Sequence, residues 1–194
     1  MRKLVVVEFL SLDGVYQAPG SPQEDPEGGF QHGGWQMPYG DETLGEAALQ
    51  GMAETDAQLF GRKTYQIMAA YWPNAPADDP FAKHLNNVQK YVVSKTLDTA
   101  DWQPTTVLKG DLAEEITALK DQPGKNITVL GSGKLLQSLL ANGLVDELML
   151  AIYPIVLGSG KRLFPDSDAV RKLRLIDSRT TSTGGLLATY APEG

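Results

Sequence analysis

The sequence of 194 residues predicts an α/β fold in a single domain that covers residues 1–194. Stretches rich in β-branched residues alternate along the chain with stretches whose apolar residues recur every three or four positions. Hydrophobic residues make up 42% of the chain and charged residues 21%, a normal balance for a globular protein with a sizeable core. We find no stretch with the composition of a linker that would divide the chain into two domains.

The expected strands are short apolar stretches. The first of them, KLVVVEFL, is almost continuously apolar, as in a strand that is buried on both faces. The last two are expected to pair as a hairpin. The predicted strands are residues 3–10, 57–60, 90–97, 105–110, 126–130, 146–156, 172–181 and 184–192.

The expected helices show apolar spacing of three and four residues. In the first, Leu44, Ala47, Ala48 and Met52 follow this spacing, and Asp41 could cap the N-terminus. The predicted helices are residues 41–55, 64–70, 111–120 and a fourth that follows a glycine turn and ends near residue 142. Two proline-rich loops, 16–40 and 72–80, separate these elements, and the longer one is expected to be mobile or to cover a site.

Composition excludes several kinds of function. The formal net charge of −7 repels a phosphate backbone, so we expect no nucleic-acid partner and no binding to anionic membranes. The chain has no cysteine, which excludes disulfides and thiolate nucleophiles. His32 and His84 have no carboxylate at ligand spacing, so we expect both to be exposed and no metal site. Glu8 interrupts the N-terminal apolar run and no cleavage site follows, which favours a cytoplasmic protein.

The segment Gly61-Arg62-Lys63-Thr64 lies where a strand is expected to pass into a helix. Two adjacent cations at a helix N-terminus oppose the helix dipole. An anionic ligand, bound by both the cations and the free backbone N–H groups, would offset that cost. The alternative is an ordinary turn in which glycine serves the backbone and the cations are solvated.

A glycine turn, LGSGKL, occupies residues 130–135 between a strand and a helix. It is not a P-loop, because Leu135 stands where Ser or Thr is required, and Leu136 stands where the dinucleotide fingerprint needs its third glycine. Either the backbone of this turn receives a ligand or the turn is only structural. Ser94 and Lys95 also follow a strand, and three such ends on one edge of a parallel sheet could surround one polyanionic ligand.

Five segments resemble, in this order, the dihydrofolate-reductase-like superfamily, and in particular its branch with the reductase domain of bacterial riboflavin biosynthesis. They are SLDG at 11–14, LFGRKTY at 59–65, VVSKT at 92–96, VLGSGKLLQSLL at 129–140 and DELMLAIYPIVLGSGKRLF at 146–164. The resemblance implies a mixed, mostly parallel sheet flanked by helices, NADPH as cofactor, and hydride transfer to a small heterocyclic substrate. The cofactor-binding residues that it implies are Gly61, Arg62, Lys63, Thr64, Ser94, Lys95, Leu130, Gly131, Ser132, Gly133, Lys134 and Leu135.

The resemblance implies fewer residues on the substrate side. Asp13, in the SLDG segment, and Asp41, near the position of the acid in dihydrofolate reductases, are the catalytic candidates, although a turn aspartate and a helix cap would explain them equally well. Trp35 and Tyr153 are candidate walls for a flat ring, or core residues.

Four alternatives remain at this point: a pyrimidine-deaminone reductase, a dihydrofolate reductase proper, a nucleotide-binding module without turnover, and a purely structural domain. The strand at residues 148–157 either pairs across a homodimer, as in similar domains, or is central in the sheet.

Overall fold

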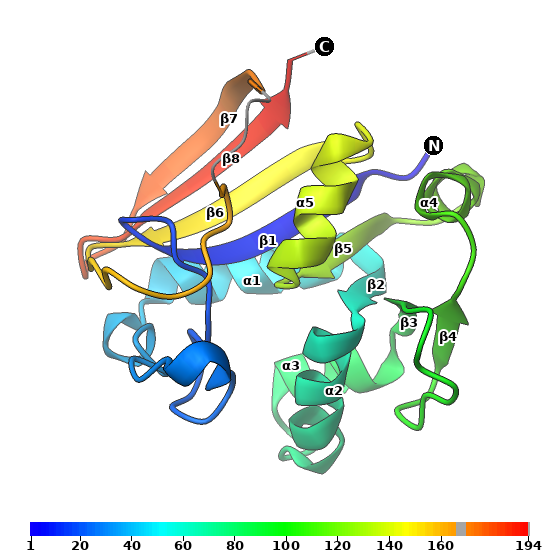
Figure 1. Cartoon of the computed structure of the whole chain (residues 1–194), viewed down its shortest axis with the longest axis horizontal. Helices are drawn as coiled ribbons and strands as arrows, with labels where there is room; N and C mark the ends of the chain where they lie inside the picture. Colours follow the sequence, from blue (N-terminus) through cyan, green and yellow to red (C-terminus); the bar gives the residue numbers. More distant parts are fainter. Residues whose placement is uncertain (166–169, 194) are drawn as a thin grey trace. The chain divides into compact units, whose positions relative to one another are not determined.

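A computed structural model describes residues 1–165 and 170–193 of the chain (Figure 1). The described residues form one eight-stranded sheet in the order β4-β3-β2-β5-β1-β6-β8-β7, with helices between the strands. The expected fold class, α/β with a mixed, mostly parallel sheet flanked by helices, is confirmed. The strands are β1 (Leu4–Ser11), β2 (Thr55–Gly61), β3 (Gln89–Val93), β4 (Thr105–Leu108), β5 (Asn126–Leu130), β6 (Glu147–Tyr153), β7 (Leu173–Thr180) and β8 (Leu186–Pro192). The α-helices are α1 (Glu42–Ala53), α2 (Arg62–Tyr71), α3 (Pro80–Asn87), α4 (Leu112–Asp121) and α5 (Gly133–Ala141).

The chain divides into two compact units. The first unit consists of Met1–Val5 and Gly51–Val145, and the second of Val6–Gln50 and Asp146–Gly194, of which residues 166–169 and 194 are not described. That the whole chain is a single domain stays a prediction.

The first unit holds the parallel part of the sheet. Its strands β4, β3, β2 and β5 pair side by side in parallel. One cluster of its core consists of Phe60, Tyr65, Leu85, Val92 and Trp102, where Phe60 stacks on Trp102 at a centroid distance of 6.2 Å. This packing fixes α2 and α3 against the sheet and therefore fixes where the C-terminal ends of the strands lie.

The second unit holds the antiparallel part. The expected hairpin is confirmed, since β7 pairs with β8 in antiparallel register, and β8 pairs in turn with β6. The long strand predicted at 148–157 is central, because β6 lies between β1 and β8 in the strand order. The 16–40 loop contains two short 3-10 turns, η1 (Glu27–Gly29) and η2 (Met37–Tyr39), and no longer element.

Helix α3 was not expected, and it corrects the prediction of a polar stretch around residue 84. Asp79 caps this helix by accepting hydrogen bonds from the N–H groups of Phe81 and Ala82, and Pro80 occupies its first turn. An aspartate followed by proline is a recognisable helix start, so the signal was present in the sequence.

Strand β3 ends four residues earlier than predicted. Ser94 Oγ accepts hydrogen bonds from the N–H groups of Thr96 and Leu97. This local turn competes with continuation of the strand, as serine side chains often do. Conversely, α2 begins two residues earlier than predicted, at Arg62, so both cations of the Gly-Arg-Lys-Thr segment lie inside its first turn.

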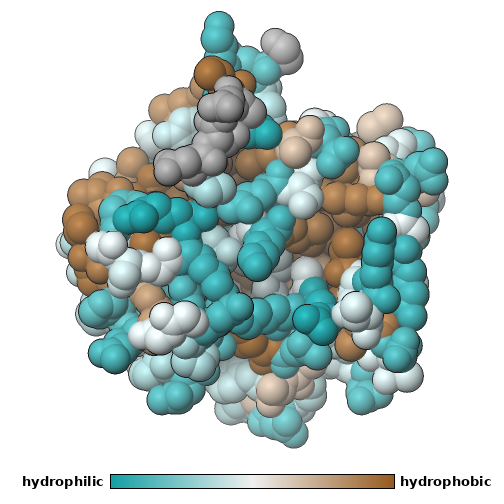
Figure 2. Space-filling view, in the orientation of Figure 1, coloured by the Kyte–Doolittle hydropathy of each residue, from teal (hydrophilic) through white to brown (hydrophobic). Residues whose placement is uncertain are grey.

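Hydrophilic residues and separate groups of hydrophobic residues intermix on the surface that Figure 2 shows. Exposed apolar side chains include Leu175 and Ile176 on β7, which is an edge strand of the sheet. Within residues 1–165 and 170–193, no helix has the length and apolar character needed to cross a bilayer.

Candidate functional site

Three parallel strands of the first unit end at the same level. Gly61 at the end of β2 pairs with Val93 at the end of β3. On the other side of β2, Leu59 pairs with Val129 of β5, so Gly61 and Gly131 both lie two residues beyond that pair. The register therefore brings together the three strand ends that the sequence analysis singled out, on the edge where α/β sheets bind ligands.

The N-terminus of α2 lies at this edge without a side-chain cap. Its N-cap residue is Gly61, which has no side chain that could accept a hydrogen bond from the first turn. The N–H groups of the first turn of a helix have no partner within the helix, and they carry the positive end of its dipole. Arg62 and Lys63 add two exposed cations there, and no acidic residue occurs in the first turn.

The N-terminus of α5 lies beside that of α2. Gly131 and Ser132 have φ values of 63° and 68°, so two successive residues adopt the left-handed conformation before the helix begins at Gly133. Ser132 Oγ accepts a hydrogen bond from Gly61 N–H at 3.0 Å. A Cβ atom built on Gly131 would lie 3.6 Å from Thr64 Cγ2, which is ordinary contact distance.

The third strand end contributes Ser94 and Lys95. Ser94 is buried, and its hydroxyl oxygen accepts two backbone hydrogen bonds, which leaves the hydroxyl proton available to a ligand. Lys95 is exposed. Leu130 and Leu135 are apolar supports of this region: Leu130 packs against the Phe60 cluster, and Leu135 is buried 3.7 Å from a Cβ atom built on Gly61.

Three cations of this region have no partner. Among the described residues, the side chains of Arg62, Lys95 and Lys134 make no hydrogen bond or ion pair, and all three are exposed. Two uncapped helix N-termini and three unpaired cations gather positive charge in one region of a chain whose net charge is −7. We call this region of the first unit the cation edge.

Asp13, a predicted catalytic residue, has a carboxylate whose oxygens already accept several hydrogen bonds. Its carboxylate accepts hydrogen bonds from Ser11 Oγ at 2.7 Å and from the N–H groups of Leu157 and Gly158 at 3.0 and 2.9 Å. Arg162 lies 3.5 Å away. Desolvation alone would raise the pKa of Asp13, but the hydrogen bonds from Ser11 and the two backbone groups lower it to about 2. This carboxylate ties two loops of the second unit together and has no proton to donate at neutral pH.

Asp41, the other catalytic candidate, caps α1. Its carboxylate accepts hydrogen bonds from Thr43 N–H at 2.7 Å and from the backbone and side chain of Ser182 in the turn between β7 and β8. The hydrogen bond from the Ser182 hydroxyl is the largest cause that lowers the pKa of Asp41 to about 2. Asp41 therefore joins the start of α1 to the β7–β8 hairpin.

Trp35 and Tyr153, the predicted walls of a ring site, do lie together. Their rings meet edge to face at a centroid distance of 5.7 Å, and Tyr39 lies 5.6 Å from Tyr153. Both belong to the core cluster of the second unit, with 5% and 1% of their surface exposed. The indole N–H of Trp35 donates to Gln17 O at 2.8 Å, whereas Tyr153 Oη has no hydrogen-bond partner among the described residues.

Two polar residues that were not predicted, Glu8 and Lys90, are buried, and a third, His84, is half-buried. Glu8 is 2% exposed, and desolvation, partly offset by the Phe9 N–H, raises its pKa to about 8. Lys90 is fully buried and donates to the carbonyl oxygens of Leu85 and Val88. His84, predicted to be exposed, is half-buried on α3, where burial lowers its pKa. A single charge within an apolar run was the signal for Glu8.

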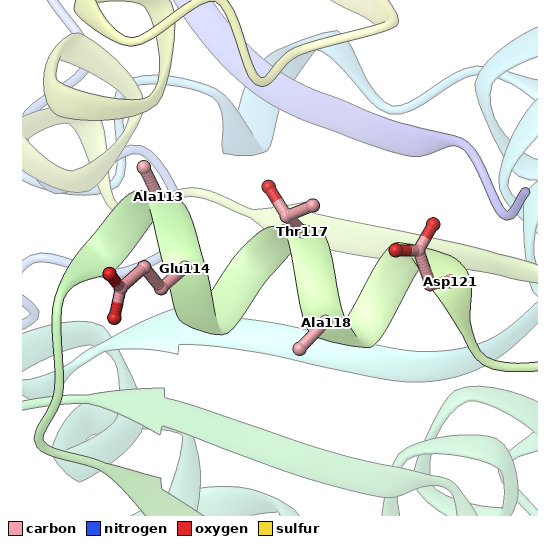
Figure 3. A pocket seen from close by; sticks show the side chains of 5 residues that line it. All are labelled: Ala113, Glu114, Thr117, Ala118 and Asp121. Carbon is pink, nitrogen blue, oxygen red and sulfur yellow. The ribbon is translucent and has the colours of Figure 1, made fainter.

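The cation edge is separate from a shallow hollow on α4. Figure 3 shows that the residues lining this hollow project from that one helix: Ala113, Glu114, Thr117, Ala118 and Asp121. None of them is a predicted site residue, and the two carboxylates would repel a phosphate. Among residues 1–165 and 170–193, no group of three or more His, Asp or Glu side chains is placed to hold a metal ion.

The mixed eight-stranded sheet, together with the family match given next, makes this chain a member of the dihydrofolate-reductase-like class of α/β proteins. The chain belongs to the RibD C-terminal domain family, whose sequence profile matches residues 2–187. Membership of this family supports a reductase role. Among curated proteins, the uncharacterized protein YyaP of Bacillus subtilis strain 168 is 34% identical over 140 residues, which are 71% of this chain and 74% of YyaP.

Solved structures share the fold at lower identity. A putative riboflavin biosynthesis protein from Shewanella sp. PV-4 superposes with a TM-score of 0.70 at 23% identity and covers 99% of both chains. A pyrimidine reductase-like protein from Corynebacterium diphtheriae gives a TM-score of 0.64 at 15% identity, covering 100% of this chain and 92% of that one. A third structure is a diaminohydroxyphosphoribosylaminopyrimidine deaminase/5-amino-6-(5-phosphoribosylamino)uracil reductase from Thermotoga maritima. It gives a TM-score of 0.64 at 13% identity, covering 99% of this chain and 57% of that one.

Proposed function

We propose that this protein is an NADPH-dependent reductase that transfers hydride to a small heterocyclic substrate. The observation that carries the proposal is the cation edge, where two uncapped helix N-termini and three unpaired cations meet at the ends of adjacent parallel strands. Family membership supports it, because reductases of this family generally use NADPH.

The residues of the cation edge fit the phosphates of NADPH in their chemistry. Backbone N–H groups at helix N-termini and unpaired cations are the groups that bind phosphate in proteins. In this proposal the N–H groups of the first turns of α2 and α5, with Arg62 and Lys134, hold the pyrophosphate. Ser94 and Lys95 hold the 2′-phosphate, and lysine does so as a point charge without the bidentate fork of arginine.

When bound, NADPH supplies the hydride, and the chain's own residues bind and orient the reactants. Ionised Asp13 and Asp41 do not serve as proton donors in this proposal, because both carboxylates already accept several hydrogen bonds and have a pKa of about 2. They position loops of the second unit instead. The proton that balances hydride addition then comes from water or from another group.

The pyrimidine-type substrates named for two of the structural neighbours make a pyrimidine or a similar ring our first choice. Dihydrofolate is less favoured, because Asp41 caps α1 and binds Ser182. We further propose a cytoplasmic location and a homodimer. Pairing between subunits would not involve β6, whose neighbours in the sheet are β1 and β8.

Calorimetric titration with NADPH and, separately, with NADH tests this proposal. We expect tight binding of NADPH and much weaker binding of NADH, because only NADPH carries the 2′-phosphate. Loss of absorbance of the reduced nicotinamide with a small heterocycle would then distinguish a reductase from a non-catalytic nucleotide-binding module. Absence of binding of both dinucleotides would remove the reductase assignment.

A further inference from the structure

Glycines bound a short tip, residues 28–34, within the 16–40 loop of the second unit. The sequence of the tip is GGFQHGG, so two glycines stand on each side of residues 30–32. Three of these glycines have φ values in the left-handed region that favours glycine: Gly28 at 70°, Gly29 at 75° and Gly34 at 78°. Hinges are a few loop residues, often small ones, that absorb a change in backbone angles. The two glycine pairs are therefore suitable hinges for the tip.

Hydrogen bonds are confined to the two ends of this tip. Within the described parts of the chain, residues 30–33 donate and accept none. At the ends, Gly29 N–H donates to Pro26 O at 3.1 Å, and Gly34 N–H donates to Ala18 O at 2.8 Å. Segments with few buried contacts and without hydrogen bonds open locally more easily than the rest of a fold. The middle of the tip is therefore held by packing alone.

Phe30 is the side chain that provides this packing. Its ring lies so close to Gly160 that a Cβ atom built on Gly160 would be 2.8 Å from Phe30 Cε2 and 2.7 Å from Val15 Cγ1. The ring also packs against the core cluster of the second unit. The exposed His32 meets it edge to face at a centroid distance of 5.6 Å. Gly160 thus serves as a seat for Phe30 because it has no side chain.

Lys161, the neighbour of that seat, binds the base of the loop, residues 16–27. Its Nζ donates to Asp25 Oδ2 at 2.7 Å and also binds the Glu27 carboxylate. Its backbone N–H donates to Gln17 Oε1 at 3.1 Å, and its carbonyl oxygen accepts from Tyr16 N–H at 2.9 Å. The Gln17 amide donates in turn to the carbonyl oxygens of Asp25 and Glu27, both at 2.9 Å. These bonds fix the loop up to the beginning of the tip.

The part of the loop after the tip is also anchored. Trp35 is 5% exposed, and its Nε1 donates to Gln17 O at 2.8 Å. Thr183 Oγ1, in the turn between β7 and β8, donates to Tyr39 O at 3.3 Å. The tip therefore lies between two anchored stretches and can move without either of them.

We propose that residues 28–34 form a flap that turns about its two glycine pairs, with Phe30 as its catch on Gly160 and Lys161 as the latch that holds the base of the loop. Lifting of the flap takes Phe30 off Gly160 and exposes one side of the core cluster, while the bonds of the base to Lys161 stay intact. Lys161 is a positioning residue in this device. Flaps of this kind control ligand exchange in many enzymes, but the motion itself does not depend on the proposed reductase function.

Distances between pairs of spin labels test the flap, because the chain has no cysteine and introduced thiols are the only labelling sites. The tip pair combines Gln31→Cys with Ser178→Cys on β7, and the base pair combines Gln23→Cys with the same Ser178→Cys. All three positions are exposed. Phe30→Ala, which removes the catch, should abolish the single narrow distance of the tip pair and leave that of the base pair unchanged. Phe164→Ala, at an exposed phenylalanine of the same unit, is the control and should change neither pair.

Lys161→Met tests the latch and should broaden the distances of both pairs, whereas Lys161→Arg keeps the charge and should leave the base pair narrow. Thermal unfolding checks that each variant is folded. Phe30→Leu, which keeps an apolar side chain but loses the flat ring on Gly160, repeats the test should the alanine variant not fold. A tip pair that stays narrow without the Phe30 ring, or a base pair that broadens together with it, would overturn the flap. An unchanged base pair in Lys161→Met would remove Lys161 as the latch.

Discussion

Ser132 Oγ accepts a hydrogen bond from the Gly61 backbone N–H at 3.0 Å, which joins the turn before α5 to the residue before α2. This bond connects two segments that are 71 residues apart in the sequence. It aligns two uncapped helix N-termini at the ends of parallel strands, and the cation edge depends on that alignment.

We therefore expect Ser132→Gly to weaken NADPH binding by about three- to tenfold, the value of one neutral hydrogen bond. Glycine accepts the φ of 68° at this position, so the substitution removes the bond without straining the backbone. The free energy of unfolding should change by less than about 1 kcal/mol, because relief of left-handed strain offsets the lost bond. Calorimetry and urea unfolding measure the two effects. Ser138→Ala, whose hydroxyl bonds only within α5, is the control, and equal affinities in both variants would argue against the alignment.

Arg62→Ala should weaken NADPH binding about tenfold or more, because a charge-assisted bond to phosphate is lost. The same change should leave the free energy of unfolding unchanged or raise it by about 0.3–1 kcal/mol, since Arg62 opposes the dipole of α2. The affinity difference should shrink as NaCl rises from about 50 to 200 mM, because salt screens exposed charges. Lys83→Ala removes an exposed charge elsewhere in the first unit, and a loss of affinity as large as that of Arg62→Ala would exclude a specific role for Arg62.

Asp41→Asn should lower the thermal midpoint at pH 7 without lowering the turnover number. Asparagine can still cap α1, but it loses the ionised acceptor for Ser182. The pKa of Asp41 is depressed in the folded chain from 3.8 to about 2. Its stabilisation is therefore present above the unfolded value and is lost as the pH falls through the folded value. Thermal unfolding at pH 7 and pH 2 should show a difference between variant and wild type that is much smaller at the lower pH. A large fall in turnover of dihydrofolate would revive the dihydrofolate reductase alternative.

Glu8→Gln should stabilise the protein at alkaline pH and have little effect near pH 5. Burial raises the pKa of Glu8 from 4.5 to about 8, so the folded chain holds a proton that the unfolded chain releases in between. The wild-type protein therefore loses stability as the pH rises from about 4.5 to about 8, by roughly 5 kcal/mol at most. Urea unfolding at pH 5 and pH 8.5 measures this. Glu114→Gln, at an exposed position on α4, keeps Glu8 and should decline with pH as the wild type does, whereas a parallel decline of wild type and Glu8→Gln would refute the assignment.

Local patterns in the sequence determined most of the elements. Alternation of β-branched and helical stretches identified all eight strands and four of the five α-helices among the described residues, because these patterns follow from side-chain spacing along one segment. Helix α3 was missed since its apolar spacing is short and its start lies in a proline-rich stretch. The residues of the cation edge were also identifiable, because each follows a strand end.

Contacts between distant segments decided the rest. Pairing of Gly61 with Val93, and of Leu59 with Val129, brings three strand ends level, which no single segment specifies. The saturated carboxylate of Asp13 depends on Leu157 and Gly158, 144 and 145 residues away. The burial of Tyr153, at the end of β6, depends on packing by Trp35 from the 16–40 loop. Sequence therefore determined which residues could form elements and carry charge, whereas tertiary packing decided which polar groups are satisfied and which remain available to a ligand.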